Sequence, residues 1–344
     1  MFGRSRRAAS GVCRRQKTNM STLYITTQGA SVHRNSGQIV VRKNAAILQN
    51  IPDEQVKQIT LVGNVNLSTP VMAFCLDKQI EVVFLTQGGK FRGRLDSGAT
   101  RAVDIRKAQY DRAHNKEFCL RTAKAFIYAK IHNQLALARR QNTSPNEMAT
   151  LAAMLRRSKT ARDLEALRGI EGAASAGYFK MFRAWIPSPF VFKNRVAHPP
   201  TDEVNALLSL SYTLIHNRIT TQLNFIGLDP YMGFFHQARN GHAALASDLV
   251  EEFRPVIGDA LVLKLVRRKF IKPEDFERVG RAFNLSANGK KVFFREFESK
   301  MAATRLVTDQ GDRASFSRLI EMQARKLTRV IRGETKDYCP FKNR

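Results

Sequence analysis

Four side chains between residues 171 and 251 of this 344-residue sequence have the types and spacing to hold a divalent cation. Asp248 and Glu251 are three positions apart, so a helix through them would place both carboxylates on one face. Two carboxylates on a partly buried face repel each other unless a cation neutralises them. His236 follows a glycine–aromatic turn twelve residues before Asp248, and Glu171 stands among small residues. Glu252, the next acid along, is expected to point into solvent.

This donor set matches the chemistry of a hard divalent ion. Carboxylate oxygens favour Mg²⁺ or Mn²⁺, and one imidazole shifts the preference toward Mn²⁺. Such ions assist phosphoryl transfer by neutralising phosphate charge and activating the attacking oxygen. Spacing alone leaves other interpretations open, because Glu171 is 65 residues from His236. Glu171 is also compatible with a carboxylate at a helix N-terminus, favoured by the helix dipole, and His236 with an ordinary core histidine.

The charge of the chain points to a polyanionic partner. Lys and Arg number 57 against 29 Asp and Glu, which gives a formal net charge of +28. An excess of this size strains a compact fold by self-repulsion. We therefore expect nucleic acid as the partner, with an anionic membrane surface as the minor alternative. Residues 1–20 hold six of the basic residues and no acid, and they lack the apolar core of a secretory signal, so we expect a basic disordered leader.

Several classes of protein are excluded by composition and motifs. No stretch approaches the ~18 uninterrupted apolar residues of a membrane-spanning helix. The four cysteines lie far apart without a Cys-x-x-Cys pair, which excludes a disulfide scaffold and a cysteine-built zinc site. This usage fits a reducing compartment, and we expect a cytoplasmic protein. The sequence also lacks a Walker-type phosphate loop and the His-Glu-x-x-His and Gly-x-Ser-x-Gly motifs.

Residues 21–100 have the pattern of a small β-sandwich or β-roll. Short β-prone runs alternate with polar turns, and Gly37 lies in a hairpin turn where a positive φ is expected. Pro70 opens a short helix over residues 69–76. The expected strands cover residues 22–26, 30–33, 38–42, 58–62, 80–85 and 91–95.

Residues 101–335 are predicted to form a larger α-helical domain that carries the site, because apolar residues recur there at helical intervals. Asp202 is the expected N-cap of one helix. The fold class is therefore α+β, a small N-terminal β domain followed by an all-α C-terminal domain. For residues 336–344 we expect a frayed tail, with partner docking as the alternative. The expected helices cover residues 103–140, 149–169, 173–185, 204–227, 243–253, 258–268, 272–283 and 317–331.

Four segments, taken in order, resemble the CRISPR-associated endonuclease one family, the integrase of the CRISPR adaptation module. They are residues 169–172, 199–209, 227–236 and 248–255, and the match extends to residues 80–93. The resemblance covers nearly everything after Met20. Each segment alone is common, but their ordered conjunction is specific. The visible departure is Thr201-Asp202-Glu203, where the family pattern has Asp followed by Pro, in a segment with a structural role.

The resemblance implies both an activity and a site. Family members insert short duplex spacers into a CRISPR array by 3′-hydroxyl transesterification, and they cleave DNA in a metal-dependent reaction. It implies that Glu171, His236 and Glu251 bind Mg²⁺ or Mn²⁺, and that Asp248 is a further acid of the same site, supportive or a second ligand. The implied partners are double-stranded DNA, a second copy of the chain and a small ferredoxin-like adaptation protein.

Four basic residues near these segments are candidates for DNA phosphate contacts, namely Lys193, Arg195, Arg239 and Arg254. Each is equally compatible with a solvated surface charge, and Arg254 with pairing to a nearby carboxylate. Two other functions stay open. One is an integrase relative encoded by a mobile element and using the same chemistry. The other is a non-catalytic, basic nucleic-acid-binding protein.

Overall fold

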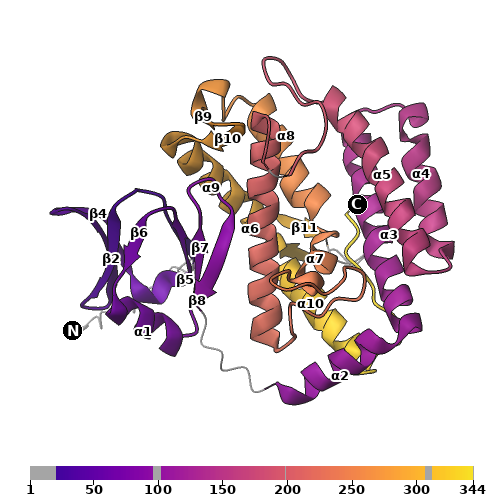
Figure 1. Ribbon diagram of the computed structural model, residues 1–344, viewed down its shortest axis with the longest axis horizontal. Helices are drawn as coiled ribbons and strands as arrows, with labels where there is room; N and C mark the ends of the chain where they lie inside the picture. Colours follow the sequence, from indigo (N-terminus) through magenta and orange to yellow (C-terminus); the bar gives the residue numbers. More distant parts are fainter. Residues whose placement is uncertain (1–20, 96–101, 198, 307–311, 344) are drawn as a thin grey trace, which may run out of the picture.

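The computed structural model describes residues 21–95, 102–197, 199–306 and 312–343. A β region built from the N-terminal part of the chain lies beside a larger, mostly helical region (Figure 1). The predicted fold class is therefore confirmed. The expected leader and the expected domain boundary near residue 100 lie outside the described residues. Within the described ranges, no helix is long and apolar enough to span a membrane.

Two four-stranded sheets make up the β region. The first has the order β1 (Ser21–Ile25), β5 (Val56–Val62), β7 (Glu81–Leu85) and β8 (Phe91–Leu95). The second has the order β4 (Ala46–Pro52), β3 (Gln38–Lys43), β2 (Ala30–Asn35) and β6 (Val65–Leu67). Apolar side chains from both sheets and from α1 (Thr69–Asp77) form one buried cluster. Gly37 has a φ of 74°, as the turn pattern predicted.

Strands β4 and β6 had no recognisable signal in the sequence. In β4, five of the seven residues are exposed, including Ile47 and Leu48, so the strand lacks an alternation of buried and exposed positions. Its pairing with β3 is antiparallel and aligns Ile51 with Ile39. Backbone pairing to a neighbour with a buried face, rather than burial of its own side chains, therefore places β4 in the sheet.

The helical region starts with α2 (Val103–His114) and α3 (Lys116–Arg140), which we expected as one helix. Asn115 separates them, because its side chain accepts the backbone N–H of Phe118 and caps α3. Asp202 caps α6 as predicted, with Oδ1 2.7 Å from the backbone N of Asn205. Helix α9 was not expected. The remaining helices are α4 (Pro145–Thr160), α5 (Leu164–Ala184), α6 (Glu203–Ile226), α7 (Ala244–Val250), α8 (Ala260–Arg267), α9 (Ala287–Ala302) and α10 (Phe316–Ile331).

Helix α5, which carries Glu171, differs from the expectation. The predicted break between Gly169 and Ala173 is absent, and the chain breaks instead at residues 161–163. Asp163 is the N-cap of α5, which continues without interruption over 21 residues. Glu171 lies about two turns inside this helix. The interpretation of this acid as a helix N-terminal carboxylate is therefore wrong, since the dipole effect is confined to the first turn.

Residues 272–283 form a hairpin instead of the expected helix. A 3-10 turn (Pro273–Asp275) leads into β9 (Phe276–Val279) and β10 (Ala282–Leu285), with Gly280 at a φ of 60° between them. Positive φ at a glycine suits a tight turn and interrupts a helix. A second hairpin pairs β11 (Thr304–Leu306) with β12 (Arg313–Ser315), so the C-terminal region is mainly helical and includes two small sheets.

Buried polar contacts join the β region to the helices. Glu81 on β7 accepts a hydrogen bond from Thr221 on α6 and pairs with Arg94 at 2.8 Å. Tyr24 on β1 donates to Glu298 on α9 at 2.7 Å. Because Glu81 is only 5% exposed, it needs these partners to stay buried. The first sheet is thus held against α6 and α9 (Figure 1).

We expect Gly227→Ala to destabilise the protein by about 1 kcal/mol or more. Gly227 ends α6 with a φ of 96°, and an added Cβ would lie 2.2 Å from the Cβ of Ala102. Gly169→Ala is the matched control, because its Cβ would meet nothing within 4 Å on the helix surface. The free energy of unfolding of Gly169→Ala should rise by about 0.5–1 kcal/mol. Urea unfolding measures both, and equal stabilities would contradict the prediction.

Candidate active site

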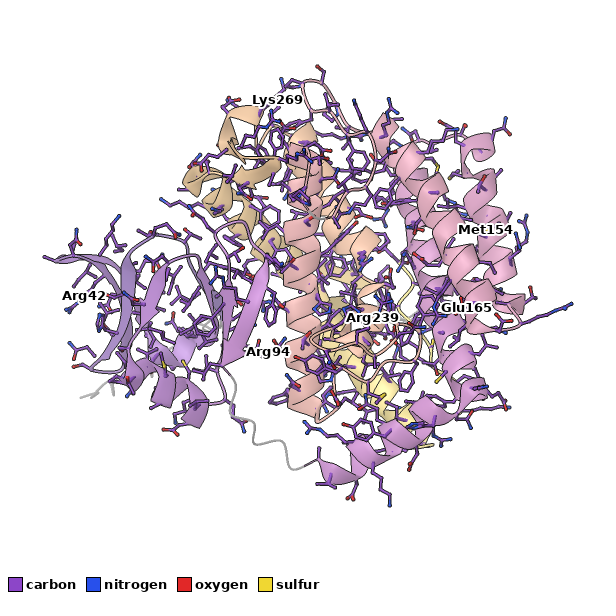
Figure 2. All side chains as sticks on the ribbon, viewed as in Figure 1. Arg42, Arg94, Met154, Glu165, Arg239 and Lys269 are labelled. Carbon is purple, nitrogen blue, oxygen red and sulfur yellow. The ribbon has the colours of Figure 1, made fainter. Side chains whose placement is uncertain are left out.

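Glu171, His236 and Glu251 come together at one place in the helical region, although three separate elements carry them. Glu171 on α5 and His236 on the loop between α6 and α7 line an open cleft of about 580 Å³. Glu251 is buried beside them with its side chain 3% exposed, and its Oε1 lies 4.0 Å from His236 Nε2. Figure 2 labels two further lining residues, Glu165 on α5 and Arg239 on the loop.

Asp248 on α7 organises the loop that presents His236. Its Oδ2 accepts the backbone N–H groups of Phe234 and Phe235 at 2.6 and 3.0 Å. Its Oδ1 accepts the backbone N–H of His236 at 2.8 Å and lies 2.7 Å from Nδ1 of the same residue. Gly233 is required in this turn, because an added Cβ would lie 2.9 Å from the backbone of Ala244. With both oxygens occupied by the loop, Asp248 has the geometry of a supporting residue rather than a direct ligand.

The contact between His236 Nδ1 and Asp248 Oδ1 sets the tautomer of His236 and raises its pKa. Because the ring offers Nδ1 to a carboxylate, Nδ1 carries the proton in the neutral form and Nε2 keeps its lone pair. Burial alone would lower the pKa of His236. The hydrogen bond to Asp248 and the charges of Asp248 and Glu251 outweigh burial and raise the pKa above its ordinary value. A histidine held in this way resembles a metal ligand whose second nitrogen is fixed by a carboxylate.

Glu251 is a buried carboxylate held between two cations. It follows the last turn of α7, immediately before a π-helical turn (Arg254–Asp259). Its Oε1 lies 3.2 Å from Arg254 Nη1, and its Oε2 lies 2.9 Å from Nζ of Lys130 on α3. Lys130 also forms an ion pair with Glu171. Burial opposes ionisation of Glu251, but Arg254, Lys130 and His236 lower its pKa to about 2.

Lys130 is a buried cation that pairs with both carboxylates of the site. Its side chain is 6% exposed, and its ammonium contacts Glu171 and Glu251 at once. Burial lowers the pKa of Lys130, but the two carboxylates raise it above its usual value. Lys130 and Glu251 are therefore charged at neutral pH.

The donor set fits a hard divalent ion. Glu171 and Glu251 offer carboxylate oxygens and His236 offers Nε2, which are ligand types that Mg²⁺ and Mn²⁺ accept. The buried Oε2 of Glu251 has the ammonium of Lys130 as its neighbour, at 2.9 Å. Among the residues that the structure describes, no three His, Cys, Asp or Glu side chains are already arranged as a metal cage. The ammonium of Lys130 instead lies between the two carboxylates.

Comparison with known proteins identifies the family. The sequence matches the model of "CRISPR associated protein Cas1" over residues 23–299. A curated relative, CRISPR-associated endonuclease Cas1 1 of Chlorobaculum tepidum, is 33% identical over 94% of this chain and 99% of its own length. The chain belongs to the Cas1 family.

Other relatives and solved structures agree with this assignment. A CRISPR-associated exonuclease Cas4/endonuclease Cas1 fusion of Geobacter sulfurreducens is 35% identical, over 94% of this chain and 60% of the fusion. The CAS1 protein from Thermotoga maritima superposes with a TM-score of 0.80 at 23% identity, over 91% of this chain and 97% of that one. A casposase bound to integration product gives a TM-score of 0.82 at 22% identity, over 94% and 95% of the two chains. These structural likenesses show the Cas1 fold.

The four basic candidates occupy different places in this Cas1 chain. Arg239 is exposed and lines the cleft. The guanidinium groups of Arg195 and Arg254 lie 5.3 and 5.0 Å from the ring centre of Tyr212, and Arg254 pairs with Glu251 as the alternative interpretation held. Lys193 is exposed and is not among the residues that line the cleft. Arg239 is therefore the candidate with the best access to a phosphate in the cleft.

Three residues of the cleft and its floor were missed by sequence reasoning. Lys130 had a signal, because it is a single cation within the apolar run of residues 126–131. Arg168 lies three residues before Glu171 and donates to the carbonyl of Phe235 at 3.2 Å, which ties the loop to α5. His242 lines the cleft opposite α5 and pairs with Arg239 in an isolated β-bridge. Nothing in their local sequence singled out Arg168 or His242.

Glu252 is fully buried, so the expectation that it points into solvent is wrong. It accepts hydrogen bonds from Tyr338 Oη, from the backbone N of Phe341 at 2.6 Å and from Gln323 Nε2 at 3.0 Å. Burial raises the pKa of Glu252 to about 7, against the lowering effect of these donors. The acid binds the C-terminal segment of the chain instead of water.

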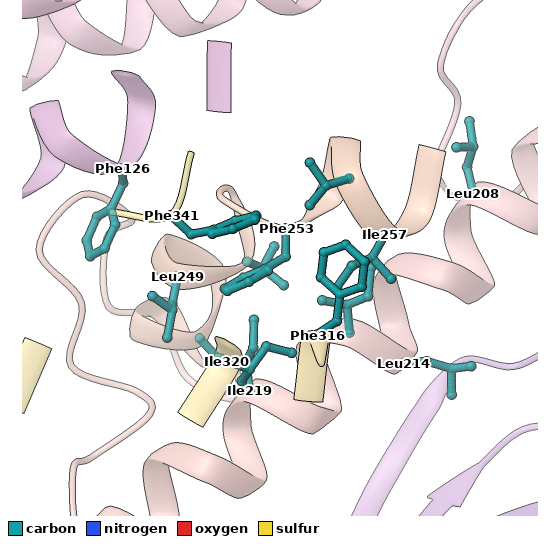
Figure 3. Packing of buried hydrophobic residues seen from close by; sticks show 14 of the residues in the cluster. Phe126, Leu208, Leu214, Ile219, Leu249, Phe253, Ile257, Phe316, Ile320 and Phe341 are labelled. Atoms are coloured by element: carbon teal, nitrogen blue, oxygen red, sulfur yellow. The ribbon is translucent and has the colours of Figure 1, made fainter. Parts of the chain in front are cut away.

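Tyr338, Phe341 and Asn343 are consequently buried in the core, and the expected frayed tail is wrong. Phe341 stacks on Phe253 with ring centres 5.8 Å apart and an interplanar angle of 7° (Figure 3). Asn133 on α3 donates to the carbonyls of Glu252 and Phe341 at 2.8 and 3.1 Å, and accepts the backbone N–H of Asn343 at 2.7 Å. Asn133 lies one turn after Lys130, so this segment ties α3 to the chain that carries Glu251.

We expect Asp248→Asn to lower the pKa of His236. The amide removes the negative charge and one acceptor from the contact that favours the imidazolium. Histidine ring resonances, followed by NMR against pH and assigned with His236→Gln, measure this. Glu165→Gln is the control, because this exposed acid on α5 lines the same cleft. An unchanged pKa in Asp248→Asn would show that this carboxylate does not control the imidazole.

We also expect Glu252→Gln to change how stability depends on pH. The pKa of Glu252 is about 7 in the folded chain, above its unfolded value, so the folded state binds this proton more tightly. Ionisation of Glu252 therefore costs stability as pH rises from about 4.5 to 7, by at most about 3 kcal/mol. The variant lacks this loss. Urea unfolding at several pH values should give a shallower decline for Glu252→Gln than for wild type, and parallel curves would contradict the assignment.

Proposed function

We propose that this chain is a divalent-metal-dependent DNA endonuclease and integrase of CRISPR adaptation. In this proposal it inserts short duplex spacers into a CRISPR array. The observation that carries the proposal is the meeting of Glu171, His236 and Glu251 beside an open cleft in a Cas1-family chain. The net charge of +28 supports a phosphodiester substrate, because a polyanion offsets the self-repulsion of the protein.

Glu171, Glu251 and Nε2 of His236 would hold the ion. A bound Mg²⁺ or Mn²⁺ neutralises phosphate charge and activates the attacking oxygen. The chain's own contribution is positioning: Asp248 fixes the ring of His236, and Arg254 keeps Glu251 ionised. Arg239 faces the cleft, where it can contact a phosphate of the DNA backbone.

The reaction exchanges one phosphodiester bond for another. The 3′-hydroxyl oxygen of the spacer forms a bond to a phosphorus of the repeat, and the bond from that phosphorus to its 3′ oxygen breaks. The attacking hydroxyl loses a proton and the leaving oxygen gains one. Water in place of the hydroxyl gives strand cleavage, so one site serves both the integrase and the endonuclease activity.

The proposed assembly contains two copies of this chain, a small ferredoxin-like partner protein and duplex DNA. Solved structures of the same fold include a Cas6-RT-Cas1–Cas2 complex and a TtCas1–DNA complex, which supports this proposal. The fold likeness to a casposase is compatible with a mobile-element integrase. The Chlorobaculum tepidum relative, matched over 99% of its length and named a CRISPR-associated endonuclease, favours the CRISPR role.

The test is an integration assay with the full-length chain, Mn²⁺, a plasmid carrying a CRISPR repeat and a labelled duplex with free 3′-hydroxyls. We expect Glu171→Gln and His236→Gln to reduce joining and cleavage about 100-fold or more, since each removes a group that acts at the reacting phosphate. Glu165→Gln, which changes a neighbouring acid on α5, should retain activity. The assay is run with and without the small partner protein.

Each outcome of this assay decides between functions. Label joined to the plasmid supports an integrase, and nicking without joining leaves a metal-dependent nuclease. If Glu165→Gln loses as much activity as Glu171→Gln, the acids act through the negative charge of the cleft as a whole and not through specific positions. A folded wild type that binds DNA in Mn²⁺ and leaves every strand intact contradicts the proposal and favours a basic binding protein.

A further inference from the structure

Lys130 is a buried cation that the proposed reaction does not use. Its ammonium forms ion pairs with Glu171 from α5 and with Glu251 after α7, and its side chain is 6% exposed. Lys130 itself lies on α3, so three separate elements meet through this one charge. Both of these partners, Glu171 and Glu251, are carboxylates that would hold the divalent ion.

The two carboxylates need a cation between them whether or not a metal ion is present. Glu251 is 3% and Glu171 26% exposed, so water screens their mutual repulsion poorly. Arg254 neutralises Glu251 from the Oε1 side, at 3.2 Å, but it has no ion pair with Glu171. Among the described residues, Lys130 is the cation that contacts both carboxylates.

The ammonium also lies where the two carboxylates that would hold the ion come together. Lys130 Nζ lies 2.9 Å from Glu251 Oε2, and Glu171 approaches it through Oε1, which also accepts from Ser175 Oγ at 2.9 Å. A divalent ion bound by both acids would add two positive charges beside this ammonium, at a site that water screens poorly. The ion and the ammonium therefore compete for the same two carboxylates.

We propose that Lys130 is the internal cation of the ion-free site, which holds Glu171 and Glu251 together until a divalent ion displaces its ammonium. This inference rests on the proposed metal-dependent function and concerns what happens before the ion binds. The long, flexible lysine stem allows the ammonium to leave without movement of α3. Glu251 keeps Arg254 after the exchange, so the site retains one of its two original cations.

Displacement has a measurable cost for metal binding. The incoming ion must break two ion pairs that stabilise the ion-free chain, so wild type binds the ion more weakly than a chain without this lysine. Lys130→Met keeps the apolar stem and removes the charge. We expect Mn²⁺ to bind Lys130→Met about tenfold more tightly than wild type, and the melting temperature in EDTA to fall by several degrees.

Two further variants keep the test informative. Lys130→Arg retains the charge and offers a planar fork that pairs well with carboxylates, so Mn²⁺ should bind more weakly than to wild type. This variant remains useful where Lys130→Met fails to fold without metal. Lys124→Met is the matched control, because it removes a half-buried lysine from the same helix, and it should leave Mn²⁺ affinity unchanged.

The experiment is isothermal titration calorimetry of the full chain with MnCl₂ at fixed ionic strength, together with thermal unfolding in EDTA. Tighter binding by Lys130→Met and weaker binding by Lys130→Arg support the displacement. Equal or weaker binding by folded Lys130→Met overturns it, since Lys130 then positions the ligands with the ion bound. If neither wild type nor the variants bind Mn²⁺, the metal-dependent function fails and this inference fails with it.

Discussion

The arrangement of the site depends on a buried carboxylate, Glu251, that is stable only between two cations. With a side chain 3% exposed, it cannot remain ionised unless Arg254 and Lys130 stay in place. Arg254 comes from the π-helical turn, and Lys130 comes from a helix more than a hundred residues earlier. The packing of α3 against this turn is thus an electrostatic requirement as well as an apolar one, and it brings Glu171 into the same charge cluster.

The loop before α7 solves a second problem, which is how to aim an imidazole that no regular element carries. Asp248 receives three successive backbone N–H groups and the ring Nδ1, so one carboxylate fixes both the path of the loop and the rotation of His236. Gly233 permits the close approach to α7 that this requires. The twelve residues between His236 and Asp248 let the chain turn back, so that Asp248 on α7 can contact the loop that precedes this helix.

Sequence reasoning predicted the fold class, six of the eight N-terminal strands and the residues that meet at the cleft, because apolar periodicity and ordered motifs are local signals. It failed where long-range contacts decide the outcome. Strand β4 has no buried face of its own, and α5 continues through Gly169 because helical neighbours support it. Glu252 resembles a surface acid until the donors from Tyr338 and Phe341 are placed around it. The local sequence around Glu252 carries no signal for hydrogen-bond donors more than eighty residues away.

The burial of Tyr338, Phe341 and Asn343 has a consequence for how the protein is made. Glu252 leaves the ribosome long before Tyr338, and during that interval its carboxylate has none of the donors that the finished core supplies. An acid without partners favours water, so the packing around Glu252 is complete only once Tyr338 and Phe341 have been made. The candidate site is thereby assembled late. A nascent chain carries Glu171 and Glu251 before all the contacts that position them have formed.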